Sequence, residues 1–500
     1  MIAAARLRCQ DRRRGHTGGP MVVAGVPAAD PASLGMSTEC LEAFAEQLAA
    51  KYVDTGLVPG AALVIVRRGQ LVFLRAWGGY KVDTVVKLYS LSKVLTALAA
   101  LQLVDEGKLA LDDAASARVP EWPHAHLVEG PEGAVRTAGE ALTLRHCFTH
   151  TCGHSYHMAT VHPVAAQRPA ERRLLVARQQ GISPVARDLR ALVVNVAGQP
   201  LLFDPGKHFN YGGLGSILLA RAIEEASGTT FAEYLRRRLF GPAGMADTGF
   251  SISEAKKRDC VAVEVHPWVV PSLAAAMPRV TFSHWASLLR FLARGLAALI
   301  LGRPFIRFVP PGAGVLSRRP LWDASETLHH PDAGMVSTVG DMAKLMRLLT
   351  GGGGGVLGAG TLRCIAEPAT PELQAPFALD APALRGHLFD ASGHASARVW
   401  RWALAALCCL WPGRRASAGR PQNSLPGQCF GLGACVVTDP EAAGLTSRCA
   451  GTWHWVGFAS TYLCVNPREE LAACFLTQLI SHRTHPIGHE LIEGVHRCLV

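Results

Sequence analysis

The chain has 500 residues, of which 49% are hydrophobic and only 18% are charged, and its formal net charge is +11. This balance predicts a globular protein with a sizeable core and excludes an intrinsically disordered chain. Because the basic residues are scattered and are not interleaved with aromatic ones, we expect no nucleic-acid partner.

Residues 1–34 are predicted to form an arm outside the domain, which spans residues 35–500. The arm is rich in arginine and poor in acids but has no long apolar core, so it is not a secretory signal. Such a start permits a mitochondrial transit peptide, although its many Gly and Pro residues weaken an amphipathic helix. Mitochondrial and cytoplasmic locations therefore both stay open.

The first elements of the domain are a helix and a β-hairpin. Ser37 can cap a helix that runs to about Lys51. Residues 61–66 and 71–76 are apolar stretches separated by a Gly-containing turn, which predicts two antiparallel strands.

A Ser-x-x-Lys segment follows, made by Ser90 and Lys93, and it leads into an apolar run that Gly107 ends. We expect a buried helix with Ser90 at its N-terminus. Residues three apart share a helix face, so the Lys93 amine lies beside the Ser90 hydroxyl, where free backbone N–H groups could bind an oxyanion. Ser90 alone could be an ordinary N-cap. A second Ser-x-x-Lys, Ser253 to Lys256, lies in a polar stretch and is not followed by such a helix.

The second half alternates helical and strand patterns. We expect a short helix from Thr143, ended by Gly153, and longer helices over 214–227 and 339–349. Strands and an Asn-Pro turn are expected between residues 431 and 478, followed by a last helix over 486–498.

Two insertions interrupt this order, at about residues 257–325 and 385–426. Each holds an apolar segment, residues 286–301 and 399–411, that is too short to span a membrane comfortably. These segments could add to the core, lie on a membrane surface, or contact a protein partner or a second copy of the chain.

The 14 cysteines include no C-x-x-C pair, and several, such as Cys464 and Cys474, lie in apolar runs. This usage favours buried thiols in a reducing compartment over a disulfide framework. The clusters of histidine lack metal-ligand spacing, and no nucleotide-binding loop is present, so we predict no metal site and no cofactor.

The segment around Ser90 and Lys93, and Tyr211 within the stretch 202–215, resemble the first two motifs of the serine β-lactamase and penicillin-binding-protein superfamily. The closest resemblance is to class C β-lactamases, to esterase-like (family VIII) members and to a eukaryotic β-lactamase-related protein. Further stretches resemble blocks of the superfamily that argue for the fold: residues 119–122, 142–154, 240–248, 330–338 and 451–467.

The resemblance implies a mixed α/β fold of the α+β type, an antiparallel β-sheet flanked by helices with a mostly helical second half and the site between them. It implies Ser90 as nucleophile, with Lys93 and Tyr211 as general base and acid. The backbone N–H groups of Ser90 and Phe458 would bind the oxyanion.

Two positions depart from the superfamily pattern. Gly213 stands where the second motif has asparagine, and Trp455 stands where the Lys-Thr-Gly motif has lysine. Gly457 keeps the glycine of that motif, which would let the strand approach the acyl group. The substrate-binding positions are thus Gly213, Trp455 and Gly457.

Three functions follow from these motifs. The first is a serine hydrolase that acts on small ester or amide substrates through an acyl-enzyme on Ser90. The second is a D-Ala-D-Ala-type peptidase, which would need a clamp for the substrate carboxylate. The third is a weak or inactive scaffold with an assembly or binding role, for which Gly213, Phe458 and the insertions argue.

Overall fold

The structure is a computed structural model that describes residues 22–125, 127–129, 135–154, 188–198, 200–201, 203–265, 306–307, 330–370, 426–480 and 486–500. The apolar segments of both insertions, residues 286–301 and 399–411, lie outside these described residues. The predicted arm is described from residue 22 onward, and there Ala29 N donates a hydrogen bond to Leu71 O at 3.0 Å.

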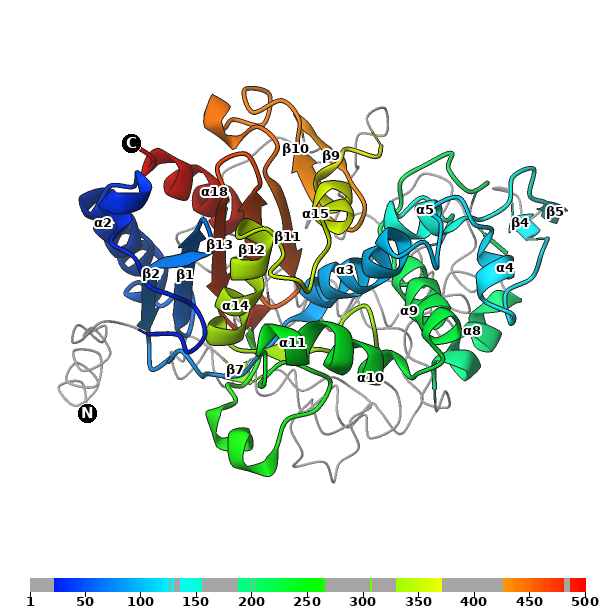
Figure 1. The fold of residues 1–500 in the computed structure, drawn as a ribbon, viewed down its shortest axis with the longest axis horizontal. Coiled ribbons are helices and arrows are strands. Elements are labelled where there is room, and N and C mark those ends of the chain that lie inside the picture. The colour runs from blue at the N-terminus through cyan, green and yellow to red at the C-terminus, as the bar shows by residue number, and fades with distance from the viewer. Residues whose placement is uncertain are drawn as a thin grey trace, which may run out of the picture.

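A seven-stranded sheet forms the centre of the domain (Figure 1). Its strands are β1 (Ala61–Arg67), β2 (Gln70–Trp77), β9 (Gln428–Phe430), β10 (Cys435–Val437), β11 (Trp453–Gly457), β12 (Thr461–Asn466) and β13 (Leu471–Leu476). They lie in the order β2-β1-β13-β12-β11-β10-β9, and every neighbouring pair is antiparallel. The predicted hairpin therefore joins the C-terminal strands through β1 and β13, with Val64 opposite Cys474.

Both faces of this sheet are covered, which explains why β1 is apolar from Ala61 to Val66. Leu63 and Ile65 pack in one core with α2 and α18, whereas Val64 and Val66 pack in the other core with α3 and α14. A strand that is buried on both sides loses the apolar-polar alternation of a half-exposed strand. These helices are α2 (Thr38–Leu48), α3 (Ser92–Asp105), α14 (Val339–Thr350) and α18 (Ile487–Arg497).

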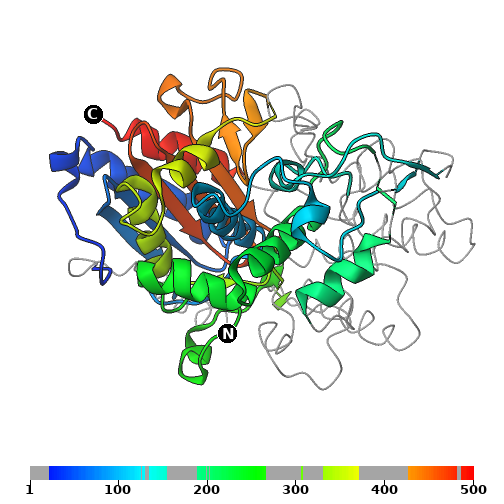
Figure 2. The ribbon, with the colours of Figure 1, turned by 45° about the vertical axis from the view of Figure 1, so that its right-hand side comes forward.

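The helical half lies beside the sheet, and α3 runs between the two (Figures 1 and 2). Its centre is α9 (Leu214–Ser227), which packs against α3 and α5. The other helices here include α4 (Ala115–Arg118), α5 (Leu144–Phe148), α8 (Leu189–Ala197), α10 (Phe231–Leu235) and α11 (Gly241–Ala243). Helix α15 (Ala359–Ala366) packs against α3 on the side of the sheet (Figure 1). This arrangement confirms the predicted fold class and puts the start of α3 at the junction of both halves.

Several predicted elements have the expected bounds. Ser37 caps α2, and Gly228 ends α9 in the left-handed conformation. The helix that begins after Thr143 is shorter than predicted, because α5 ends at Phe148 and His150 adopts a positive φ of 55°. The chain turns there before it reaches Gly153.

The cysteine prediction was incomplete. Cys464 and Cys474 are buried free thiols as expected, but Cys40 on α2 and Cys498 after α18 form a disulfide. These cysteines are 458 positions apart in the sequence, and the packing of α2 beside α18 brings their Cα atoms to 5.3 Å. No local pattern in the sequence predicts that these two cysteines pair.

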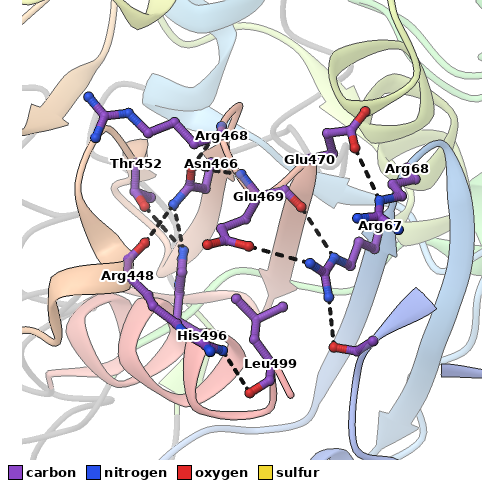
Figure 3. A network of polar contacts seen from close by, with 11 residues as sticks. Arg67, Arg68, Arg448, Thr452, Asn466, Arg468, Glu469, Glu470, His496 and Leu499 are labelled. Carbon is purple, nitrogen blue, oxygen red and sulfur yellow. Dashed lines mark hydrogen bonds and ion pairs between the residues drawn. The ribbon is translucent and has the colours of Figure 1, made fainter. Parts of the chain in front are cut away.

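A buried polar network joins the ends of β12 and β13 to α18 (Figure 3). His496 Nδ1 lies 2.7 Å from Ile492 O, a group that can only accept, so Nδ1 carries the proton. His496 Nε2 then accepts from Asn466 Nδ2 at 2.9 Å, and Asn466 also donates to Arg448 O. The imidazole is thus neutral, in keeping with burial, which lowers the pKa of His496.

This network predicts that the protein loses stability in mild acid. Unfolded histidine takes a proton below its ordinary pKa of about 6.5, whereas folded His496 does not until lower pH, so the unfolded state binds more protons. The free energy of unfolding should fall by about 1 kcal/mol per pH unit on this account as the pH drops below about 6.5. Urea unfolding between pH 7 and 4.5 would measure it. The variant His496→Gln, which can still accept from Asn466, should decline less steeply, and an unchanged slope would contradict the prediction.

Candidate active site

The predicted nucleophile lies in a tight turn that leads into α3. Ser90 is the middle residue of a 3-10 turn, Tyr89–Leu91, and α3 itself begins at Ser92, two residues later than predicted. Tyr89 has a positive φ of 49°, an unfavourable conformation for a residue with a side chain. Backbone strain of this kind is tolerated where the surroundings fix the chain.

Two hydrogen bonds hold the residue before this turn. Leu88 N donates to Met335 O at 2.9 Å, and Thr461 Oγ1 on β12 donates to Leu88 O at 3.1 Å. Gly457 makes this second approach feasible, because a Cβ there would lie 2.2 Å from Leu88 O. The predicted need for glycine at this position thus has a physical reason, the close contact of β11 with the backbone before Ser90.

Lys93 faces Ser90 across the first turn of α3. Lys93 Nζ lies 3.5 Å from Ser90 Oγ, at the long end of hydrogen-bond distance. Its side chain is only 2% exposed. It also donates to Asp332 O at 2.8 Å and lies 5.0 Å from the centre of the Tyr211 ring. The structure therefore brings Ser90, Lys93 and Tyr211 together.

Aromatic rings enclose the site on the side of Tyr211. The Tyr211 ring lies 5.2 Å from that of Trp455 and 4.6 Å from that of His150, and Phe430 packs edge-on against both Trp455 and His150. Burial and the nearby Lys93 charge hold the pKa of His150 well below its usual range, so its imidazole is neutral. The lining next to Tyr211 is therefore largely apolar, and His150 belongs to it.

A second aromatic pair borders the turn from the other side. The rings of Tyr89 and Phe458 meet edge to face with centres 5.9 Å apart, and Lys87 Nζ lies 5.8 Å from the Tyr89 ring. Burial lowers the pKa of Lys87 to about 8. Phe458 directly follows Gly457, so its position after β11 is next to the nucleophile turn, as the resemblance implied.

Gly213 occupies the position at which the resemblance expects asparagine. It is buried, two residues after Tyr211, and it forms the N-cap of α9, with its carbonyl accepting from Ile217 N at 3.1 Å. It brings no side chain to the site. Trp455 likewise fills the place expected for lysine with an apolar indole that is 3% exposed.

Sequence reasoning missed Asp332. It lies in the turn before β8 (Val336–Ser337), and its carboxylate Oδ2 is 3.8 Å from Lys93 Nζ. In the sequence, the stretch 330–338 was identified only as one of the blocks that argue for the fold. An acid directly before an Ala-Gly turn was the available signal, but its spacing from Lys93, 239 residues, carries no information by itself.

Within the residues that the structure describes, no group of three or more His, Cys, Asp or Glu residues is placed to hold a metal ion. Within the same ranges, none of the helices combines the length and the apolar character needed to cross a membrane.

Known proteins similar to this chain share its fold and parts of its sequence. Lovastatin esterase from Penicillium rubens is 31% identical over 213 residues, covering 40% of this chain and 50% of that protein. Esterase EstB from Burkholderia gladioli is 28% identical over 236 residues, covering 46% and 56%. The chain thus spans about half the length of these curated relatives. The solved structure of "EstCE1, a hydrolase with promiscuous acyltransferase activity" has the same fold, with a TM-score of 0.59, 20% identity and coverage of 92% and 99%.

A match to a protein-family model shows which family the chain belongs to. The Beta-lactamase model matches residues 45–403, which include Ser90, Lys93, Tyr211 and the turn that holds Asp332. This range takes in well over half of the 500 residues. The chain therefore belongs to the Beta-lactamase family, within the superfamily of serine β-lactamases and penicillin-binding proteins and on its esterase-like side.

Proposed function

We propose that this protein is a serine hydrolase that cleaves carboxylic esters through an acyl-enzyme on Ser90. Membership of the family, together with esterase and acyltransferase relatives, supports an acyl-transfer enzyme in general. The observation that carries the finer proposal is the convergence on Ser90: Lys93 Nζ lies 3.5 Å from its hydroxyl and 5.0 Å from the Tyr211 ring. A hydroxyl, an amine and a phenol in this arrangement can share one proton.

The reaction divides into two halves. Ser90 Oγ attacks the ester carbonyl carbon while its proton passes to the pair formed by Lys93 and Tyr211, and the N–H groups of Ser90 and Phe458 bind the oxyanion. The same pair returns that proton to the departing alkoxide, which leaves as the alcohol. Water then attacks the acyl carbon and gives a proton to the pair, the bond between the acyl carbon and Ser90 Oγ breaks, and the pair returns that proton to Ser90 Oγ, which releases the acid and free Ser90.

The surroundings of Ser90 favour esters with an apolar acyl group. Tyr211 and Trp455 present rings rather than charges, and Gly213 offers no amide to bind the side-chain amide of a penicillin. The family lysine that would pair with a penicillin carboxylate is replaced by Trp455. Ester substrates need neither contact.

The direct test uses purified protein with a fluorophosphonate probe, p-nitrophenyl butyrate, a fluorescent penicillin and a peptide ending in D-Ala-D-Ala. We expect labelling at Ser90, identified by peptide mass spectrometry, and ester turnover well above that of penicillin or peptide. Preferential cleavage of the peptide would replace the esterase proposal by the peptidase one. A folded protein with neither labelling nor turnover would overturn both.

A catalytically weak scaffold with an assembly role is the second candidate, and Gly213 favours it. A site without the second-motif asparagine lacks one polar contact to substrate and to Lys93. In that case the protein should form larger assemblies as its concentration rises, and deletion of residues 385–426 or 257–325 should abolish them. Light scattering over a concentration series would separate this candidate from the esterase.

Phe458 should limit the size of the acyl group. Its ring packs on Tyr89 next to the nucleophile turn, so Phe458→Ala would open space there while keeping the backbone N–H. We expect kcat/KM for branched or long p-nitrophenyl esters to rise relative to butyrate by about 10-fold, a typical effect of one or two methylene groups in a pocket. The ratio of the two kcat/KM values is the measurement. A uniform loss on all esters would contradict a role in acyl selection.

A further inference from the structure

Asp332 contacts the amine of Lys93 in two ways. Its backbone carbonyl accepts a hydrogen bond from Lys93 Nζ at 2.8 Å, and its carboxylate Oδ2 lies 3.8 Å from the same nitrogen. Both side chains are withdrawn from solvent, with exposures of 2% for Lys93 and 12% for Asp332. The attraction between two opposite charges this buried is only weakly screened.

The turn that carries Asp332 is tied to the nucleophile segment. Thr96 Oγ1 donates to Pro331 O at 2.7 Å, and Met335 N donates to Ser92 Oγ at 3.2 Å. The turn itself is closed by Gly334 N donating to His330 O, and a Cβ on Gly334 would lie 2.7 Å from that oxygen. The backbone therefore fixes Asp332 relative to α3, independently of its own side chain.

Other polar groups face the same amine or its acid. The neutral His150 and the Tyr211 ring lie on the helical side, and Ser90 lies one turn back on the same segment. His330 Nδ1 is 3.8 Å from Asp332 Oδ1, whereas Lys93 Nζ lies nearest to the other carboxylate oxygen, Oδ2. Among these described groups around Lys93 Nζ, Asp332 is the acid.

We propose that Asp332 is a positioning residue, which holds Lys93 Nζ at Ser90 through its carbonyl and sets the charge of that amine through its carboxylate. The inference rests on the proposed function, because it concerns the proton acceptor of the same site. A carboxylate at this distance favours the protonated form of an amine. Removing it should let Lys93 give up its proton at lower pH while the carbonyl contact persists.

The test is the pH profile of kcat and kcat/KM for Asp332→Asn with p-nitrophenyl butyrate. One limb of this pH profile should reflect the protonation of Lys93. We expect that limb to move to lower pH by about one unit or more, as for loss of an opposite charge within about 4–6 Å. The plateau kcat should fall about 10-fold with KM nearly unchanged. Asp332→Glu, which keeps the charge, should return the limb toward its original position. A purely structural role would lower the melting temperature without moving either limb.

Asp341→Asn is the matched control. Asp341 is a buried carboxylate that also pairs with a lysine, Lys344, at 2.9 Å, but on α14. It should lower the melting temperature and leave the profile in place. If the limb of Asp332→Asn stays where the wild type has it, the inference is wrong.

A second readout does not need turnover. Cyanate carbamylates only the neutral form of an amine, so the pH dependence of Lys93 carbamylation, measured by mass spectrometry against the exposed Lys81, reports its charge directly. Asp332→Asn should shift that dependence to lower pH by about one unit. If the wild-type protein neither labels nor turns over, the proposed function fails, and this titration still decides whether Asp332 controls Lys93.

Discussion

Ser90→Ala is expected to reduce kcat/KM for p-nitrophenyl butyrate about a thousand-fold or more, because the substitution removes the proposed nucleophile. Fluorophosphonate labelling should disappear with it. The fold should not suffer, since Ser90 is only partly buried and its hydroxyl receives a long 3.5 Å contact from Lys93. Thermal unfolding of the variant should therefore match that of the wild type closely.

The chain contains a matched control for this variant. Ser253 precedes Lys256 by the same three positions, but it is exposed and begins a short 3-10 helix, Glu254–Asp259. Ser253→Ala should keep full activity and full labelling. Retained turnover in Ser90→Ala, or its loss in Ser253→Ala, would move the chemistry away from the turn before α3.

Gly457→Ala should impair both stability and acylation. The new Cβ would lie 2.1 Å from Thr461 Oγ1 and 2.2 Å from Leu88 O, so backbone that leads into Ser90 must shift. Overpacking of this kind costs about 1–3 kcal/mol of unfolding free energy. A displacement of the nucleophile by about 1 Å can cost roughly 100-fold in rate, so the acylation rate should fall more than stability alone explains.

Stopped-flow acylation and urea unfolding of the same preparations would measure the two effects. Gly198→Ala is a suitable control, because a Cβ at Gly198, which follows α8, meets nothing within 4 Å. It should behave like the wild type in both experiments. Normal acylation in Gly457→Ala would show that β11 does not set the position of the Ser90 turn.

Local sequence patterns predicted several of the elements that build the central sheet and the helices packed on it. The hairpin of β1 and β2, the capped helix α2 and the Gly-ended α9 follow from apolar runs, an N-cap serine and a C-terminal glycine. The same patterns placed Ser90 and Lys93 on one face. Their relation to Tyr211 came from the family resemblance, since no rule of spacing links residues that far apart.

The rest depends on contacts between distant segments. Tyr89 adopts a positive φ because hydrogen bonds from Thr461 and to Met335 fix the residue before it. Asp332 reaches Lys93 because its turn is hydrogen-bonded to α3. The Cys40–Cys498 disulfide needs the two ends of the domain to be packed side by side. None of these contacts produces a periodic pattern in the sequence from which it could be predicted.

The pairing of β1 with β13 sets the earliest time at which the central sheet can be complete. Ala62 pairs with Leu476, more than 400 residues later in the chain. At ribosomal speeds of about 5–20 residues per second, the hydrophobic hairpin waits roughly 20–80 s for its partner strand. The contacts of the Ser90 turn with Gly457 and Phe458 can likewise form only after these late residues have been synthesised. Folding of the sheet is thus a late event of synthesis, and the apolar strand β1 lacks its partner β13 until the C-terminal strands emerge.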